Sequence, residues 1–263
     1  MSTQYDTIQA PYDEMRTRSI ALLEHADVQS AVAPFIKDAR ILELACGSAF
    51  YSYDLLRWGA SKVIGIDIST AMVEKARDAA GARQIRDSST IEFRVADCSK
   101  PMSFEGGPFD LVFAAWLLNY ASSSGELVEM FRNGALNLKE GGHFVSVCPP
   151  PRQEPAAYYK EERDIRPERS GGLLSEVTKD VGDGVLFHVY CSTEHGDMNF
   201  DNYHLRKRIY EASAREAGFR GEIQWSVTTV PDVFFKDRSG GASIEELESY
   251  KVTPHYGLIV VAK

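Results

Sequence analysis

The stretch "ILELACGSAFYSYDLL", Ile41 to Leu56, predicts a strand, a tight turn of small residues and the start of a helix. In open α/β sheets a turn of this kind commonly cradles a cofactor at the helix N-terminus. A dinucleotide-binding turn has the spacing G-x-G-x-x-G, because its glycines let the backbone approach a pyrophosphate. Here Ala49 and Ser52 stand where the second and third glycines would follow Gly47. The turn therefore favours a ligand without a pyrophosphate and counts against NAD.

The composition is that of an ordinary globular protein. The chain has 263 residues, 44% hydrophobic and 25% charged, enough for one domain with a substantial core. It contains no long apolar run, and its first residues lack the apolar block of a secretory signal, so we expect a cytoplasmic protein without a membrane partner. A net charge of −9 opposes attraction to phosphate backbones, so nucleic acid is not an expected partner. The four cysteines are widely separated, which predicts neither a metal site nor disulfides.

Short apolar strands alternate with amphipathic segments over the first 150 residues, which predicts a parallel sheet with helices on both faces. We expect the strands at about 40–45, 62–67, 90–96, 109–115 and 143–148. The second helix should begin at Ser69 or Thr70, since both residue types are good N-caps. A third helix, over 125–138, should end at the glycine pair that follows it.

The composition changes after the fifth strand. From Pro149 to about Asp201 the chain is rich in proline, glycine and charge, with one hairpin predicted around His195. We expect this segment to be an insertion over the edge of the sheet. A further helix and the strands "IQWSVTTV" and "HYGLIVVAK" complete the chain. Because no helix is expected between these two strands, they should form an antiparallel pair.

Acidic residues follow the strands where a ligand would lie. Asp67 ends the second strand, 20 residues after Gly47, an offset that suits a carboxylate accepting both hydroxyls of a ribose. Asp97 ends the third strand beside Cys98, where either residue could meet the edge of an adenine. Glu43 lies inside the first strand, which is costly for a charge unless it is paired or holds backbone donors. Together these positions predict adenosine linked to something other than a pyrophosphate, such as a sulfonium-linked amino acid.

Five motifs in order resemble those of class I S-adenosylmethionine-dependent methyltransferases. They are "LELACGSA", "VIGIDIS", "VADCS", "FDLVFAAWLLNY" and "LNLKEGGHFV", within roughly residues 1–150. The wording of "QYDTIQAPYD", "AAWLLNYA" and "EMFRNGALNLKEGGHFV" is most similar to small-molecule methyltransferases, including toxoflavin-type N-methyltransferases. The resemblance implies S-adenosyl-L-methionine as the cofactor.

The resemblance also implies an α/β fold, a Rossmann-like doubly wound sheet of seven strands. The last strand of this sheet would be antiparallel, and a lid insertion would follow strand five. Residues 1–263 would then form a single domain. Residues 1–25 would be an N-terminal cap over cofactor and substrate, and 149–201 the substrate lid.

Residue roles follow from the same resemblance. Gly47 and Ala45 would line the methionine moiety, and Asp67 would bind the ribose. Around these, the expected cofactor-binding residues are Ile68 and Met72 on the adenine faces, Asp97 and Cys98 at the adenine rim, Ala114 and Trp116 beside the amino-acid tail and methyl group, Tyr5, Tyr12 and Arg16 in the N-terminal segment, and Glu43 in the first strand. An arginine in the N-terminal segment could pair with the carboxylate of the cofactor.

The acceptor side is less tightly specified. We expect Trp116, Asn119 and Tyr120 to form a wall of the acceptor pocket, and the aromatic hairpin to contribute His188 and Tyr190. A hydroxyl acceptor would need a base, for which the candidate catalytic residues are His188, Tyr190 and His195, whereas an amine or thiolate would need none. The histidine spacing matches no zinc signature, so no metal is predicted.

The sequence thus predicts methyl transfer to a small-molecule acceptor with an N, O, S or activated C nucleophile. A sulfonium leaves as a neutral group, so in-line positioning at about 3 Å is the main task of the protein. The first alternative is methylation of a protein or nucleic acid, which the absence of an N-P-P-Y-like tetrapeptide after the fourth strand disfavours. The second is a cofactor-binding scaffold that transfers no methyl group. The oligomeric state is not predicted.

Overall fold

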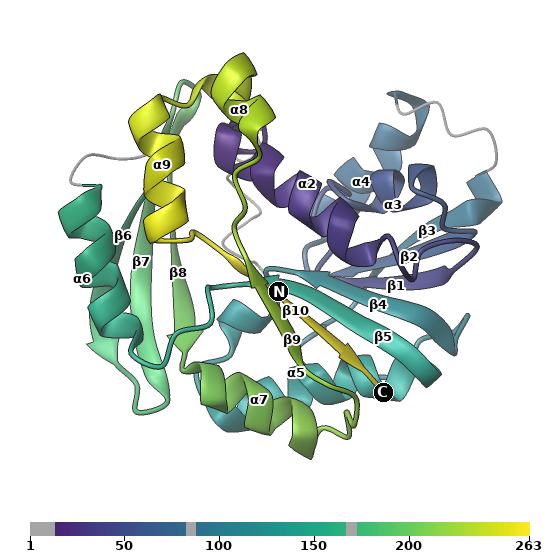
Figure 1. Cartoon of the computed structure of the whole chain (residues 1–263). Coiled ribbons are helices and arrows are strands. Elements are labelled where there is room, and N and C mark those ends of the chain that lie inside the picture. The colour runs from purple at the N-terminus through teal and green to yellow at the C-terminus, as the bar shows by residue number, and fades with distance from the viewer. Residues whose placement is uncertain (1–13, 83–87, 167–172) are drawn as a thin grey trace.

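The central element of the computed structural model is a seven-stranded sheet (Figure 1). The structure describes residues 14–82, 88–166 and 173–263. The strand order is β3-β2-β1-β4-β5-β10-β9. The strands are β1 (Arg40–Leu44), β2 (Lys62–Asp67), β3 (Ile91–Val95), β4 (Phe109–Ala115), β5 (Leu138–Cys148), β9 (Gln224–Val227) and β10 (Gly257–Ala262). Strands β1 to β5 pair in parallel, and β10 runs antiparallel to both β5 and β9. The predicted Rossmann-like α/β fold, with its antiparallel last strand, is confirmed.

Helices cover both faces of this sheet, as alternating strands and amphipathic segments require. On one face lie α2 (Ser19–Val32), α3 (Ser52–Arg57) and α4 (Thr70–Ala82), and on the other lie α5 (Ser124–Asn137) and α7 (Lys207–Glu216) (Figure 1). The predicted start of α4 is confirmed, because the Ser69 hydroxyl accepts the backbone N–H of Met72 at 3.2 Å. Three short 3-10 helices, η1 (Ser88–Thr90), η2 (Leu118–Tyr120) and η3 (Ser239–Gly241), connect other elements.

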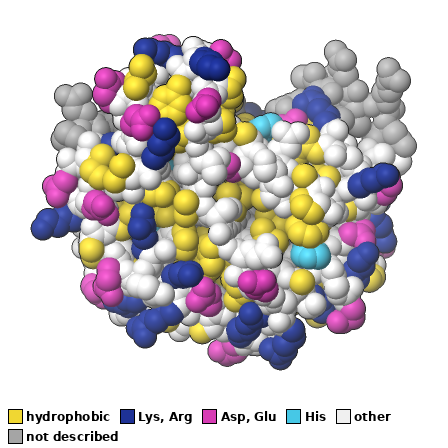
Figure 2. Space-filling view, viewed as in Figure 1, with side chains coloured by type: hydrophobic (Ala, Val, Ile, Leu, Met, Phe, Trp, Pro, Cys, Tyr) yellow, Lys and Arg dark blue, Asp and Glu magenta, His cyan; other side chains and the backbone are white. Residues whose placement is uncertain are grey.

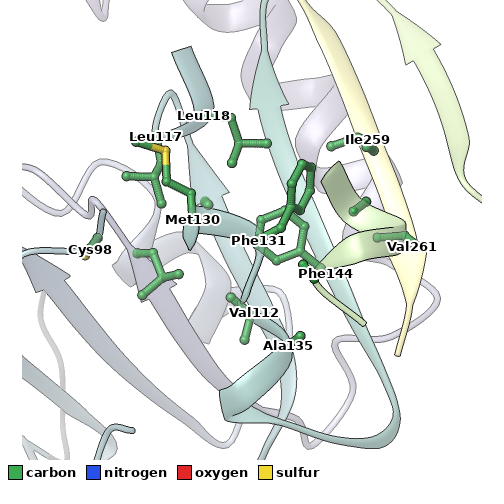
Figure 3. Packing of buried hydrophobic residues seen from close by; sticks show 14 of the residues in the cluster. Cys98, Val112, Leu117, Leu118, Met130, Phe131, Ala135, Phe144, Ile259 and Val261 are labelled. Atoms are coloured by element: carbon green, nitrogen blue, oxygen red, sulfur yellow. The ribbon is translucent and has the colours of Figure 1, made fainter. Parts of the chain in front are cut away.

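The core beneath α5 shows how closely the layers pack. Phe131 of α5 meets Phe144 of β5 with ring centroids 5.4 Å apart (Figure 3). A Cβ atom at Gly134 would come within 2.7 Å of the Phe144 ring, so this glycine lets the helix approach the sheet. Burial of each phenylalanine contributes about 1.5–3 kcal/mol to folding. Contrary to expectation, the glycine pair Gly141-Gly142 lies within β5 and does not end α5, which stops at Asn137.

A second, three-stranded sheet follows β5, and we call it the lid sheet. It consists of β6 (Leu173–Asp180), β7 (Gly184–Thr193) and β8 (Gly196–Leu205), all antiparallel. The predicted hairpin is present, with Thr193 paired to Gly196 across its turn. Helix α6 (Pro155–Ile165) packs on this sheet through Tyr158 and Tyr159, which are buried with Phe187. Neither α6 nor β6 was anticipated from the sequence, because charged and polar residues make up much of both segments.

The closing strands differ from expectation in one respect. They are antiparallel as predicted, but two helices, α8 (Asp232–Asp237) and α9 (Ile244–Val252), lie between them. The start of α9 is capped by the Ser243 hydroxyl, which accepts the backbone N–H of Glu246. In Figure 1, α9 stands beside the lid sheet, so the segment before β10 returns from the lid to the central sheet.

Candidate functional site

A cavity lies at the carboxyl edge of the central sheet and extends beneath the lid sheet. Its sheet end is lined by residues of the β1, β2 and β4 strand ends and of α4: Ala45, Gly47, Asp67, Met72, Ala115 and Trp116. Its lid end is lined by α6 and lid-sheet residues: Tyr158, Tyr159, Leu173, Phe187, Val189 and Phe200. The carboxyl edge of a parallel sheet is the place where α/β folds bind ligands.

The turn after β1 is fixed by the acid at the end of β2. Ala45, Gly47 and Ala49 have φ values of +58°, +54° and +67°, left-handed conformations that alanine seldom adopts. The Asp67 carboxylate accepts the backbone N–H of Gly47 at 2.8 Å and that of Ser69 at 2.9 Å. Each carboxylate oxygen can accept a further hydrogen bond. Asp67 therefore holds the turn and keeps acceptor capacity for a ligand in the cavity.

Glu43 has a structural position behind this turn. It is buried in β1 and accepts a hydrogen bond from the Ser52 hydroxyl at the start of α3. Burial raises the pKa of its carboxyl group to about 8, and the nearby Asp67 adds to this effect. The group is therefore largely protonated at neutral pH. Glu43 does not line the cavity, so it links β1 to α3 and does not face a ligand directly.

A buried carboxylate on α2 organises the next part of the wall. Glu24 accepts hydrogen bonds from Arg16 at 3.0 Å, from the Tyr51 hydroxyl at 2.6 Å and from the Trp116 indole at 2.8 Å. Trp116 has a φ of +59°, which is unusual for a bulky residue and is stabilised here by this bond. The Arg16 guanidinium also lies 4.5 Å over the Phe50 ring. Sequence reasoning missed Glu24, because no motif marks an acid in the middle of an N-terminal helix.

The structure separates the predicted cofactor residues into two groups. Those that line the cavity are Arg16, Ala45, Gly47, Asp67, Met72 and Trp116. Glu43, Ile68, Asp97, Cys98 and Ala114 do not line it, and Tyr5 and Tyr12 fall outside the described residues.

The residues outside the cavity have definite local contacts. Ala114 points into the core, and its neighbour Ala115 faces the cavity, because successive residues of a strand point to opposite sides. Cys98 is buried, with its sulfur 3.7 Å from the Ile66 carbonyl, and burial raises the pKa of the thiol. Asp97 accepts the backbone N–H of Ser99.

On the acceptor side, Trp116, Asn119 and Tyr120 line the cavity, but His188 and Tyr190 do not. Strand alternation explains the difference, since Phe187 and Val189 of β7 face inward and their neighbours face outward. His188 bonds instead to Asp201 at 2.7 Å, and Tyr190 packs edge-on against the His188 ring.

His195 is also outside the cavity. It lies at the hairpin turn, 61% exposed, with its imidazole 3.0 Å from Glu14. None of His188, Tyr190 and His195 lines the cavity, so this geometry does not favour the base role predicted for them.

Polar residues that sequence reasoning missed complete the lid end. Glu162 of α6 and His255 before β10 both line the cavity, and the Glu162 carboxylate lies 3.9 Å from the His255 Nδ1. Although burial opposes ionisation, contacts with His255 and Arg166 hold the pKa of Glu162 below its usual value. Asn119 donates to Asn202 of β8 at 2.7 Å, and its own Oδ1 is buried without a hydrogen-bond partner. Glu162 and His255 were missed because they come from a helix and a loop far apart in the sequence, whereas Asn119 had been predicted at the acceptor wall.

Within residues 14–82, 88–166 and 173–263, no group of three or more His, Cys, Asp or Glu side chains is arranged to hold a metal ion. Among the described helices, none is both long and apolar enough to cross a bilayer.

Comparisons with known proteins agree with this geometry. Residues 41–142 match a family model described as a methyltransferase domain. A malonyl-[acyl-carrier protein] O-methyltransferase of Legionella pneumophila is 36% identical over 115 residues, 43% of this chain and 38% of that protein. An mRNA cap guanine-N(7) methyltransferase of Saccharomyces cerevisiae is 31% identical over 125 residues, 41% of this chain and 27% of that protein. The chain thus spans less than two fifths of either curated relative.

Solved structures match over most of the chain. The CcbJ methyltransferase from Streptomyces caelestis superposes with a TM-score of 0.64 at 17% identity, covering 99% of this chain and 98% of that one. An S-adenosylmethionine-dependent methyltransferase from Mesorhizobium loti gives a TM-score of 0.60 at 20% identity, covering 90% and 96%. The predictions of a methyltransferase and of S-adenosylmethionine as its cofactor are confirmed at the level of this domain class. The toxoflavin-type chemistry stays a prediction.

Proposed function

We propose that the protein transfers the methyl group of S-adenosylmethionine to a small-molecule acceptor held beneath the lid sheet. The observation that carries this proposal is the cavity, which runs from Gly47 and Asp67 at the central sheet to Phe187 and Phe200 of the lid. A cavity that reaches from the sheet to the lid can hold a cofactor at one end and an acceptor at the other. The methyltransferase-domain match supports the same conclusion for the sheet end.

The sheet end fits adenosine linked to an amino acid. The Asp67 carboxylate would accept the two ribose hydroxyls, Gly47 would lie beside the methionine part, and Met72 would contact the adenine. The turn has no second glycine for a pyrophosphate, which supports this cofactor over a dinucleotide. Predicted roles for Asp97 and Cys98 at the adenine rim remain predictions.

Bound S-adenosylmethionine supplies a methyl group that is attached to a positively charged sulfur. After the transfer, this sulfur is part of a neutral thioether, which is a good leaving group. The residues of the chain then have mainly to position the acceptor in line and to exclude water. Trp116, fixed by the hydrogen bond to Glu24, provides a rigid wall between the two ends of the cavity. The aromatic lid-sheet face covers the acceptor end.

The lid end supports a small, largely apolar acceptor that carries some polar groups. Apolar side chains dominate this end, and Asn119 offers a buried carbonyl oxygen without a partner. The finer resemblance to small-molecule methyltransferases, including toxoflavin-type N-methyltransferases, also supports a small acceptor. On the face drawn in Figure 2, basic and acidic side chains are interspersed, and no basic stripe suited to a nucleic acid is visible there.

The test is methyl transfer from methyl-labelled S-adenosylmethionine to a deproteinised metabolite extract. We expect labelled small molecules to form, and calorimetry should detect binding of S-adenosylhomocysteine. The second candidate function, methylation of a macromolecule, draws on the relatives named for an acyl-carrier-protein substrate and an mRNA cap. Label in protein or RNA fractions alone would favour it, and binding without turnover of any fraction would favour a scaffold.

A further inference from the structure

A histidine lies at the edge of the sheet where the cofactor is expected. Strand β10 is antiparallel, so the residues that precede it lie at the carboxyl ends of its parallel neighbours. Gly257 pairs with Cys148 at the end of β5, and the Trp116 backbone N–H donates to Val147 one residue earlier. His255 lies two residues before Gly257. All six histidines of the chain lie in the described part, and within that part His255 is the one that lines the cavity.

The segment that carries His255 is held firmly to the lid. The Tyr158 hydroxyl donates to the Pro254 carbonyl at 2.7 Å, and Arg166 donates to both the carbonyl and the hydroxyl of Thr253 at 2.9 Å. On the other side, the His255 backbone N–H donates to the Thr228 hydroxyl at 2.9 Å. These bonds fix the backbone on both sides of the imidazole, as a positioned catalytic group requires.

Glu162 lies beside the imidazole ring. Its carboxylate accepts a hydrogen bond from Arg166 at 2.7 Å and lies 3.9 Å from the His255 Nδ1. A carboxylate beside Nδ1 favours the tautomer with its proton on Nδ1, which leaves the Nε2 lone pair able to accept a proton. Other titratable or charged side chains of α6 and α9 that line the two cavities are Tyr158, Tyr159, Arg163 and Tyr250.

We propose that His255 is the catalytic base of the methyl transfer and that Glu162 is its positioning residue. The inference rests on the proposed function and narrows the acceptor to one whose nucleophile must lose a proton, a hydroxyl or a ring N–H. A lone pair of that oxygen or nitrogen forms the new bond to the methyl carbon, and the sulfur–methyl bond breaks with its electron pair going to sulfur. The acceptor proton moves to the His255 Nε2, and the Glu162 carboxylate stabilises the resulting imidazolium.

The proton can then leave to solvent, because the His255 side chain is 21% exposed and also borders a second, smaller cavity. This cavity shares His255 and Glu162 with the main one and is bordered by Arg163 and Tyr250. A histidine placed between an acceptor space and such an exit can return to its neutral form after each turnover.

The experiment compares His255→Gln and Glu162→Gln with a control variant, His143→Gln. His143 lies in β5, stacks on Phe35 and does not line the cavity. Each variant is assayed with methyl-labelled S-adenosylmethionine and the deproteinised metabolite extract, and its affinity for S-adenosylhomocysteine is measured by calorimetry. We expect His255→Gln to lower labelled product formation by about 100-fold or more, Glu162→Gln by about tenfold, and the control by less than twofold. All three should bind S-adenosylhomocysteine within about threefold of the wild type.

The pH dependence separates a base from a structural residue. The wild-type rate should fall as the pH is lowered, because a protonated imidazole accepts no proton, and this fall should be absent from the residual rate of His255→Gln. A folded His255→Gln variant with near-normal turnover would overturn the inference, as would a flat wild-type profile if the variant fails to fold. Failure of the wild type to bind S-adenosylhomocysteine or to label any small molecule would instead overturn the proposed function.

Discussion

The two ends of the cavity are built in different ways. At the sheet end, several cavity-lining residues come from the turns that follow β1 and β2, and a hydrogen bond between Gly47 and Asp67 joins the two turns. At the lid end, the residues come from separate segments, such as Glu162, Phe187 and His255, which meet through the packing of α6 and the lid sheet on the segment before β10. The first end is therefore specified by motif spacing, and the second by strand register and tertiary packing.

The lid end also contains a buried base that must stay neutral. His204 of β8 is buried between the Tyr159 hydroxyl at 3.2 Å and the Pro150 carbonyl at 2.8 Å, and burial lowers its pKa to about 4. Because the folded pKa lies below the usual value of 6.5, this group contributes stability above pH 6.5 that is lost as the pH falls toward 4. The loss is on the order of 3 kcal/mol.

We expect His204→Gln to remove this part of the acid sensitivity. Chemical denaturation at pH 7 and pH 4.5 gives the free energy of unfolding of each protein, and the wild type should lose more on acidification than the variant does. His188→Gln, which changes an outward-facing histidine of the same sheet, should lose as much as the wild type. Equal losses in the wild type and His204→Gln would show that His204 is not kept neutral by burial.

At the sheet end, Asp67→Ala should weaken binding of S-adenosylhomocysteine by ten- to a hundredfold. The substitution removes the proposed ribose contact and the two backbone bonds that fix the turn, a loss of about 1.5–3 kcal/mol. Calorimetry measures the affinity, and Asp110→Ala serves as a control because this acid pairs with Lys139 away from the cavity. Unchanged affinity in a folded Asp67→Ala protein would place the ribose elsewhere.

The lid should respond in the opposite way. Phe187→Ala opens the acceptor end while leaving the turn after β1 intact, so turnover of the labelled extract should fall by about tenfold and cofactor affinity should change by less than threefold. Labelled product and calorimetry give the two readouts. If cofactor affinity falls as much as turnover does, the two ends of the cavity are not separable.

The smallest effect concerns the contact between the N-terminal segment and the hairpin turn. Glu14 accepts the backbone N–H groups of Glu194 at 2.8 Å and His195 at 3.4 Å. Glu14→Gln should make these two amides exchange with solvent a few times faster, because the amide side chain is a weaker acceptor than a carboxylate. Hydrogen exchange by NMR measures this. Equal exchange rates would mean that the turn is ordered without Glu14.

The same contrast explains how much the sequence revealed. The first five strands, the turn at Gly47 and the position of Asp67 at the end of β2 could be predicted, because they depend on local spacing. His188 was predicted to be a base because it lies in an aromatic hairpin. Successive residues of β7 face opposite sides of the lid sheet, however, and His188 lies on the side away from the cavity. His255 could not be recognised, because its partner Glu162 is more than 90 residues away and no motif joins them.

The central claim is that cofactor and acceptor share one cavity, with the reacting methyl group between Trp116 and the lid. A crystal structure of the protein with S-adenosylhomocysteine tests it most directly. We expect the ribose hydroxyls to lie within hydrogen-bond distance of Asp67 and the sulfur to be directed toward Phe187 and His255. A ligand bound with its sulfur facing away from the lid sheet, or bound outside this cavity, would contradict this arrangement.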